Sequence, residues 1–267
     1  MSTGLGGKRI LITRAAEQSR EVMEGFAGLG ATVFILPAVS FSDPLDTGPL
    51  DIAIAALTSY DWVLLTSVNA AKFLASRCRA MLGAVPVDEP PRFAAVGPAT
   101  ATAATAEGFR VEYVAREFRG VAMARELGPA VSGCKVLLPR SDRANQDLPQ
   151  YLSAQGAKVV QVVVYRTGGM GAHDARVAEM FRAGDVDVVS IFSPSALVNL
   201  QTEFGYGTLR RVASRAVLAA VGPVTADAIR EAGLPVAIVA KEATGASLIR
   251  AVSDYFAAAS HAEGKSA

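Results

Sequence analysis

The sequence has few of the residues that build metal centres and disulfide frameworks. Its 267 residues include two cysteines, Cys78 and Cys134, which form no CxxC pair. The two histidines, His173 and His261, are too few for a three-histidine zinc site. Both lie in polar stretches that we expect to be exposed, which does not suit a Ser-His-Asp triad. We therefore expect no bound metal, no disulfide framework and a reducing compartment.

An excess of charge and long hydrophobic runs are also missing. Lys and Arg total 26 against 25 Asp and Glu, a formal net charge of +1, whereas a surface that follows phosphates needs a basic excess. The first apolar run, 10–12, is too short for a signal peptide, and no run approaches membrane-spanning length. Neither GxGxxG nor GxxxxGK[ST] occurs. We expect a cytoplasmic protein without a nucleic-acid partner, a membrane partner or a cofactor.

What the sequence does contain is a series of short Val, Ile and Leu runs that alternate with amphipathic segments. Continuous apolar runs are typical of strands buried on both faces, as in parallel sheets covered by helices. The repeated strand–helix order predicts an α/β fold with doubly wound parallel sheets. The predicted strands are 9–13, 32–41, 62–66, 93–96, 110–114, 135–138, 158–167, 186–192, 217–221 and 236–240.

The chain also repeats itself over a long interval. Segment 8–14 resembles 134–140, and 61–69 resembles 187–195, each 126 residues further on. Ala95-Val-Gly-Pro-Ala-Thr-Ala101 resembles Ala220-Val-Gly-Pro-Val-Thr-Ala226, 125 residues further on. Solenoid repeats are much shorter, so this interval indicates two similar, flavodoxin-like domains.

Two predicted strands, 32–41 and 158–167, are unusually long and occupy equivalent places in the two repeats. A long strand can leave one domain and enter another, so we expect these two to pair as a two-stranded β-ribbon. The first domain would then be discontinuous, 1–36 plus 168–267. The second would comprise 42–160, with 37–41 and 161–167 as linker strands.

Candidate binding residues lie where predicted strands end and helices begin. In open α/β sheets ligands bind at these turns, because free N–H groups and the positive end of the helix dipole attract anions. Any one such turn taken alone is better explained as ordinary helix capping, whereas the repetition of Gly-Pro-x-Thr-Ala in both halves of the chain favours a function. The small polar candidates at these turns are Ser67, Asn69, Thr100, Ser193, Ser195 and Thr225.

Three arginines and one tyrosine complete the candidate set. Arg14 and Arg140 end predicted strands and, with Arg143, could bind carboxylates through bidentate hydrogen bonds, although salt bridges to neighbouring loops would explain them equally well. Tyr165 lies in the second long strand. It either packs between the domains or presents a phenol that can donate a proton in the cleft.

Together these segments resemble the uroporphyrinogen-III synthase family. The resemblance covers about 9–256 and is carried by 61–70, 95–101, 137–142, 164–167, 192–195 and 220–226. Individually these motifs are weak, but their order, spacing and duplication are more specific. Members of the family have two α/β domains joined by a two-stranded ribbon. The resemblance thus implies a lyase that closes hydroxymethylbilane into a ring, inverts the last pyrrole and releases water in haem and porphyrin biosynthesis.

The resemblance also implies roles for particular residues. A tyrosine in the Val-Tyr-x-Thr segment and a threonine in each Gly-x-x-Thr-Ala turn are implicated at the family's site, and they correspond to Tyr165, Thr100 and Thr225. Family members need no metal or organic cofactor. We expect a monomer, and the family's place in a pathway allows a transient contact with the preceding enzyme.

Two other interpretations remain open at this stage. Two α/β lobes around a cleft also describe ligand receptors, so the protein could be a cytosolic sensor that binds a tetrapyrrole without converting it. The same architecture could instead support a different enzyme, for example one that acts on sugars or phosphates.

Overall fold

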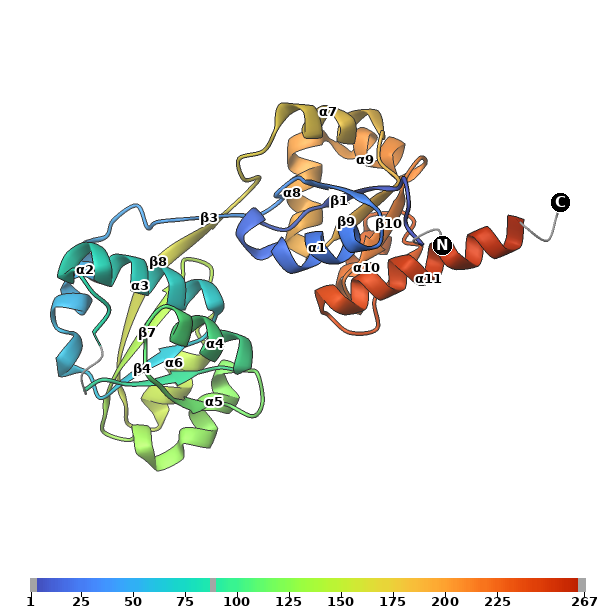
Figure 1. Ribbon diagram of the computed structural model, residues 1–267. Helices are drawn as coiled ribbons and strands as arrows, with labels where there is room; N and C mark the ends of the chain where they lie inside the picture. Colours follow the sequence, from blue (N-terminus) through green and yellow to red (C-terminus); the bar gives the residue numbers. More distant parts are fainter. Residues whose placement is uncertain (1–3, 87–89, 264–267) are drawn as a thin grey trace. The chain divides into compact units, whose positions relative to one another are not determined.

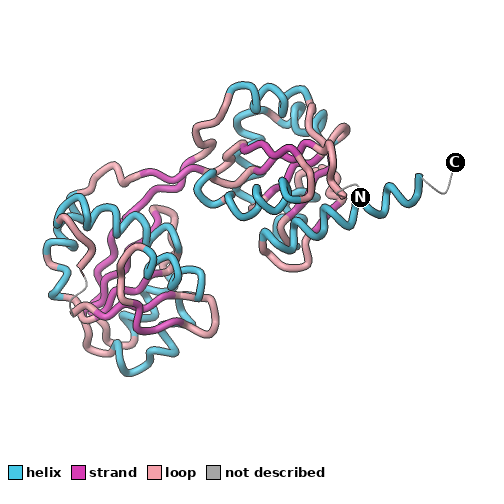
Figure 2. The backbone as a smooth tube through the Cα atoms, viewed as in Figure 1, coloured by secondary structure: helices cyan, strands magenta, loops and turns pink. Residues whose placement is uncertain are grey.

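The computed structural model describes residues 4–86 and 90–263 and divides the chain into two compact units. Unit 1 consists of Met1–Ser40 and Gly168–Ala267, and unit 2 of Phe41–Thr167. The chain therefore changes unit at 40/41 and at 167/168, where the sequence placed linker strands at 37–41 and 161–167. Figures 1 and 2 show that each unit has a central sheet with helices around it.

Unit 1 contains a five-stranded sheet in the order β11-β10-β9-β1-β2, and every neighbouring pair is parallel. Its strands are β1 (Arg9–Ile12), β2 (Thr32–Ile35), β9 (Val188–Ile191), β10 (Val217–Ala220) and β11 (Ile238–Val239). Its helices are η1 (Ala16–Gln18), α1 (Arg20–Gly28), α7 (Ala175–Ala183), α8 (Pro194–Phe204), α9 (Tyr206–Ala213), α10 (Pro223–Glu231) and α11 (Gly245–Glu263).

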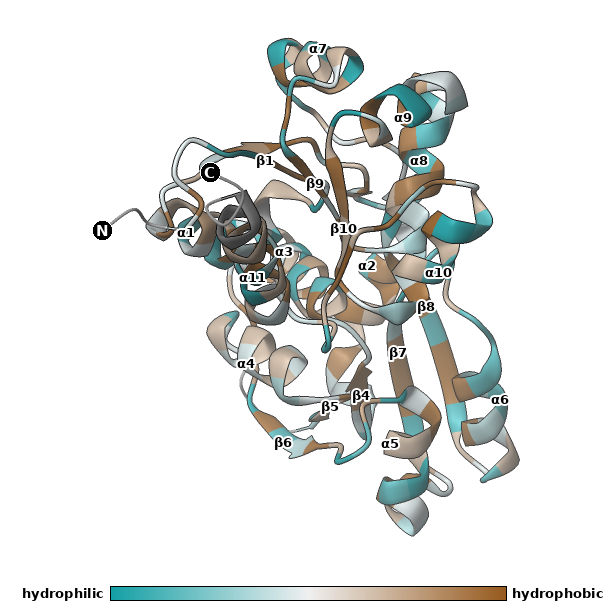
Figure 3. Ribbon diagram, turned by 90° about the vertical axis from the view of Figure 1, so that its right-hand side faces the viewer, coloured by the Kyte–Doolittle hydropathy of each residue, from teal (hydrophilic) through white to brown (hydrophobic). Residues whose placement is uncertain are grey.

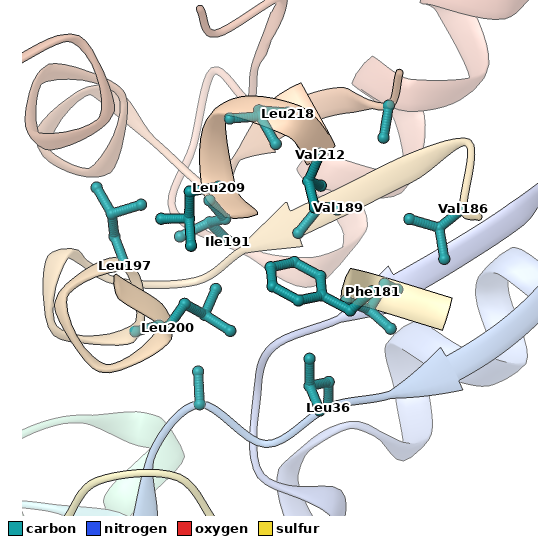
Figure 4. Close-up of a cluster of buried hydrophobic side chains, with 14 of the residues drawn as sticks. Leu36, Phe181, Val186, Val189, Ile191, Leu197, Leu200, Leu209, Val212 and Leu218 are labelled. Atoms are coloured by element: carbon teal, nitrogen blue, oxygen red, sulfur yellow. The ribbon is translucent and has the colours of Figure 1, made fainter. Parts of the chain in front are cut away.

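The core of unit 1 lies on both faces of this sheet, because successive strand residues point to opposite sides. Leu11 packs with α7, α8, α9 and α10, and Figure 4 shows Phe181 of α7 among side chains that include Val189 and Leu200. Ile10 and Ile12 face the other way and pack with α1 and α11. In Figure 3 the inner strands are accordingly hydrophobic, while α7 and α9 carry hydrophilic stretches.

Unit 2 contains a six-stranded sheet in the order β3-β8-β7-β4-β5-β6. Its strands are β3 (Ser40–Ser42), β4 (Trp62–Leu65), β5 (Arg92–Ala95), β6 (Val111–Val114), β7 (Lys135–Ser141) and β8 (Lys158–Gly168). Its helices are α2 (Gly48–Ala55), η2 (Leu57–Ser59), α3 (Val68–Leu82), α4 (Pro98–Ala106), α5 (Gly120–Leu127), η3 (Gly128–Val131) and α6 (Asp147–Ala154). Two hydrophobic clusters cover its two faces, one with α2, α3 and α4 and the other with α5 and α6.

The two sheets have the same spatial plan. Numbered along the chain, the strands of unit 1 lie in the flavodoxin-like order 2-1-3-4-5. In unit 2, β8-β7-β4-β5-β6 occupy the equivalent places, although the chain forms β4, β5 and β6 before β7 and β8. The additional strand β3 lies at the edge beside β8. The predicted fold class, two similar doubly wound α/β domains, is confirmed.

The prediction of one strand over 32–41 is wrong. β2 ends at Ile35 and β3 begins at Ser40, because Pro37 between them has no N–H and a fixed φ. Leu36 and Ala38 still donate backbone N–H groups to Ile12 and Thr13, so the segment continues beside β1. β3 is then hydrogen-bonded to β8 in the sheet of unit 2. A two-stranded ribbon that connects the domains stays a prediction.

The predicted end of the strand 135–138 is also wrong, because β7 continues to Ser141. Residues 139–141 pair with β8, whereas the pairing of β7 with β4 covers only Val136 and Leu137. Pro139 therefore lies where β7 has one partner strand, which is where a strand tolerates a residue without an N–H group.

Candidate functional site

Each sheet has one topological switch point, a pair of neighbouring strands whose following connections run toward opposite edges of the sheet. In unit 1 this switch point lies between β1 and β9, and in unit 2 between β7 and β4. The carboxyl ends of strands at a switch point are the usual ligand-binding positions of open α/β sheets. Most of the predicted site residues follow these four strands.

Arg14 follows β1 at the switch point of unit 1. Its guanidinium is half-buried, its Nε donates to Gln18 Oε1 at 3.1 Å, and its central carbon lies 5.6 Å from the centre of the Phe192 ring. Burial lowers the pKa of Arg14, but a guanidinium remains charged in proteins. A partly desolvated cation held beside a strand end is well suited to bind a carboxylate.

Ser193 and Ser195 follow β9 at the same switch point. Ser193 Oγ accepts the Ala196 N–H at 3.2 Å and thereby caps α8. The hydroxyls of Ser193 and Ser195 lie 3.0 Å apart, and Ser195 is exposed. Two hydroxyls thus lie at the N-terminus of α8, the positive end of its dipole. They follow β9 at the switch point where Arg14 follows β1.

In unit 2 the corresponding edge holds a pair of hydroxyl groups. Tyr165 of β8 is 8% exposed, and its phenol oxygen lies 3.3 Å from Ser67 Oγ. Ser67 ends the turn after β4 and caps α3 by accepting the Ala70 N–H at 3.0 Å. The structure therefore brings together two predicted site residues that are 98 positions apart in the sequence.

Two phenylalanines fix the ring of Tyr165. Phe73 of α3 stacks on it with ring centres 5.5 Å apart, and Phe41 of β3 meets it edge-on at 5.7 Å. Phe73 also lines an open hollow of about 410 Å³ whose lining includes the ammonium-bearing Lys72. The phenol is therefore held by packing on both sides, which limits the directions in which it can donate.

A polar network follows the ends of β7 and β8. Ser141 Oγ lies 3.3 Å from Thr167 Oγ1 and donates to Asp142 Oδ1, which also accepts the Thr167 N–H at 2.9 Å. Ser141 Oγ accepts the backbone N–H of Arg143 at 3.1 Å. This network sets the turn that carries Arg143, whose side chain is exposed.

Arg140 lies in a different environment from that expected. It is inside β7 opposite Val163, and only 6% of it is exposed. Its guanidinium donates to Gln161 Oε1 and to the Asn145 carbonyl, both within unit 2, and burial lowers its pKa. These bonds tie β7 to β8 and to the following loop. Binding of substrate by Arg140 stays a prediction. The burial of its guanidinium and its hydrogen bonds within unit 2 do not favour such a role.

Thr100 and Thr225 occupy the same position in the two units, the third residue of α4 and of α10. They are 5% and 4% exposed. The residues before these helices, Gly97 and Gly222, provide no side-chain cap, so the first N–H groups of both helices are available to an anion. Asn69, in the first turn of α3, is half-buried.

In the described ranges, no three His, Cys, Asp or Glu side chains are grouped so that they could hold a metal ion. The same part of the chain has no helix that is both long and apolar enough to cross a membrane.

Comparison with known proteins decides the family. Residues 20–250 match the family model described as "Uroporphyrinogen-III synthase HemD". The "Uroporphyrinogen-III synthase" of Synechococcus elongatus is 30% identical over 256 residues, which cover 93% of this chain and 96% of that protein. The chain belongs to the uroporphyrinogen-III synthase family.

Solved structures of this family share the fold. A uroporphyrinogen-III synthetase from Helicobacter pylori gives a TM-score of 0.60 at 16% identity and covers 93% of this chain and 99% of that one. A mutant uroporphyrinogen III synthase from Thermus thermophilus gives 0.56 at 20% identity, with coverages of 93% and 100%. At these identities the likeness supports the fold alone.

Sequence reasoning missed several residues around Tyr165. Phe41 and Phe73 give no local signal, because either one alone reads as an ordinary core residue. Ser141 and Thr167 could have been found, since each is a small polar residue at the end of a predicted strand, like the candidates that were chosen.

Proposed function

We propose that the protein is a uroporphyrinogen-III synthase, a hydro-lyase that converts hydroxymethylbilane into uroporphyrinogen III and water. The observation that carries this proposal is the similarity to a protein of that name over 93% of the chain. The carboxyl edges of the two sheets supply the groups that the reaction needs: cations and helix N-termini for carboxylates, and a phenol that can donate a proton.

Substrate binding relies on a few directed donors, because the protein as a whole carries a net charge of only +1. Arg14 and Arg143 bind carboxylates as charged donors. The Ser193–Ser195 pair and the uncapped first turns of α4 and α10 provide hydroxyl and backbone N–H donors. Thr100 and Thr225 belong to these first turns, where their buried side chains help to set the backbone.

Tyr165 donates the proton that lets the hydroxyl leave. Ser67 Oγ accepts the Ala70 N–H and can donate its own proton to the Tyr165 oxygen, which leaves the phenolic proton for the substrate. The C–O bond breaks with its electron pair on oxygen, and that oxygen departs as water. The azafulvenium cation left behind is attacked by the terminal pyrrole at the ring carbon that already bears its methylene bridge. The bond from that carbon to the bridge then breaks and re-forms at the free α-carbon of the same ring, which inverts the ring. The proton that the free α-carbon loses returns to the phenolate, so the enzyme ends unchanged.

Conformational control is the larger task of this enzyme. The azafulvene can close unaided without inversion, so the protein must hold the substrate in a conformation in which the inverted closure is the near-attack one. Several fixed carboxylate contacts on rigid strand ends are suited to that task. We expect the enzyme to act as a cytoplasmic monomer without a cofactor.

The test is to add the protein to enzymatically generated hydroxymethylbilane, oxidise the products and separate the type I and type III isomers. We expect type III to predominate and to form faster than type I forms without protein. Type I alone at the spontaneous rate would refute the proposal. Tight binding of hydroxymethylbilane without that acceleration would instead identify a non-catalytic tetrapyrrole sensor.

A further inference from the structure

An exposed aromatic residue stands at the carboxyl edge of unit 2, outside the set described above. Phe118 lies in the loop between β6 and α5, and 69% of it is exposed. Its ring lies directly over Gly97, the residue before α4: a Cβ added at Gly97 would lie 2.9 Å from Phe118 Cδ1. An apolar face thus borders the uncapped first turn of α4.

The loop that carries Phe118 is fixed by one carboxylate. Glu126 of α5 accepts the backbone N–H groups of Arg116 and Glu117 at 3.0 and 3.1 Å, and the Tyr113 hydroxyl at 2.7 Å. The backbone hydrogen bond from Arg116 is the largest of the causes that lower the pKa of Glu126. A ring on a fixed loop loses little conformational entropy when it meets a ligand.

Unit 1 shows that this loop does not need an aromatic residue in order to fold. Segment 240–245, Ala-Lys-Glu-Ala-Thr-Gly, corresponds to 115–120, Ala-Arg-Glu-Phe-Arg-Gly. Ala243 takes the place of Phe118 and approaches Gly222 in the same way, with 3.5 Å between its Cβ and one added at Gly222. Packing within the turn therefore does not account for the exposed phenyl ring of Phe118.

The apolar residue beside the helix N-terminus comes from different positions in the two units. In unit 1 it is Val224, the second residue of α10, which is 73% exposed. The equivalent residue in unit 2 is Ala99, and there the apolar bulk comes from Phe118. Each of these helix N-termini thus combines N–H donors with an exposed apolar side chain, which is a flat aromatic ring in unit 2 and a branched aliphatic side chain in unit 1.

We propose that Phe118 packs against one pyrrole ring of hydroxymethylbilane and helps to select the conformation that closes with inversion. The inference rests on the proposed function and deepens it. A pyrrole that bears acidic side chains has an apolar face and an anionic edge, and this part of unit 2 offers a ring for the face and N–H groups for the edge.

The experiment compares Phe118→Ala, Phe118→Tyr and the matched control Ile52→Ala. Ile52 lies on α2 of the same unit and is 73% exposed. We expect Phe118→Ala to lower kcat/KM by about 3- to 10-fold, the size that aromatic contact energies give, and to raise the share of type I product. Phe118→Tyr keeps the ring and should stay within about twofold of the wild type, as should Ile52→Ala.

A second variant moves the ring without removing it. Glu126→Gln replaces one acceptor oxygen with an N–H₂ group and loosens the loop, so Glu126 acts here as a positioning residue. We expect KM and the type I share to rise while kcat changes little. A merely structural role would lower the thermal midpoint and leave the isomer ratio unchanged.

Binding of uroporphyrinogen III by all variants separates failure of this inference from failure of the proposed function. If the wild type produces type III isomer but Phe118→Ala matches it in rate, isomer ratio and product affinity, the role of Phe118 is refuted and the function stands. If the wild type lacks activity yet Phe118→Ala binds the tetrapyrrole more weakly than Ile52→Ala does, the contact stands and the function fails. Equal binding by an inactive wild type and all variants overturns both.

Discussion

Replacing Tyr165 with phenylalanine removes the proposed acid and little else. The ring keeps its contacts with Phe73 and Phe41 at 5.5 and 5.7 Å. The lost hydrogen bond to Ser67 is 3.3 Å long, beyond the usual O–H···O range, so its loss should cost about 0.5 kcal/mol of unfolding free energy. Ser67 still caps α3, and the variant should fold normally.

The expected effect on the reaction is much larger. General-acid catalysis typically contributes about 100- to 10,000-fold. We expect Tyr165→Phe to slow type III formation by less, about 10- to 1000-fold, because conformational control is the larger task of this enzyme; this corresponds to about 1.4–4 kcal/mol of transition-state stabilisation. Some turnover should remain, because holding the conformation does not depend on the phenol. The isomer ratio should therefore change less than the rate does.

A matched control is Tyr60→Phe. Tyr60 lies two residues before β4, at the amino edge of the same sheet, and is 4% exposed. The assay is single-turnover cyclisation with isomer separation, with circular dichroism to confirm folding. If folded Tyr165→Phe keeps the full rate and Tyr60→Phe does too, the phenol is not the acid, and the proposed step is wrong even though the family assignment stands.

Three further outcomes are expected. Ser190 Oγ is buried and has no partner among the described residues, so Ser190→Ala should raise the unfolding free energy by about 1 kcal/mol; a lower urea midpoint would contradict this. Burial raises the pKa of both thiols, that of Cys78 to about 11, so at pH 8 a thiol reagent should modify half-buried Cys134 faster than buried Cys78. Two equally fast thiols would count against that. A chelator should leave cyclisation unchanged, and loss of activity that added metal restores would refute the prediction of no metal.

The fold could be predicted largely from the sequence because buried parallel strands have a simple signature. Runs such as 62–65 and 188–191 are buried on both faces and almost entirely apolar, and the duplication supplied a second copy of each signal. The predictions failed where a single residue changes the backbone locally. Pro37 interrupts a run that hydropathy alone reads as one strand, and Pro139 lies inside a strand whose pairing is one-sided there.

The candidate site was only partly predictable, for a different physical reason. Helix caps such as Ser67 and Ser193 follow from local rules, because the cap and its N–H partner lie three residues apart. The Ser67–Tyr165 pair depends on which strands become neighbours, and no local pattern gives that. Arg140 shows the converse, since its sequence position suggested a binding residue while its hydrogen bonds are internal.

The duplication itself limits what the site can do. Two copies of one α/β unit would offer the same donors at both carboxyl edges, yet the reaction must treat the terminal pyrrole differently from the others. The differences between the copies therefore carry the information about which ring is inverted. Tyr165 has no phenol counterpart in unit 1, where Val39 occupies the equivalent position, and Phe118 corresponds to Ala243. Unit 1 has an unmatched ring of its own, Phe192, whose counterpart is Thr66, but that ring lies beside the Arg14 guanidinium. Under the proposed function we therefore expect unit 2 to discriminate between the rings and unit 1, through Arg14 and its serine pair, to bind carboxylates.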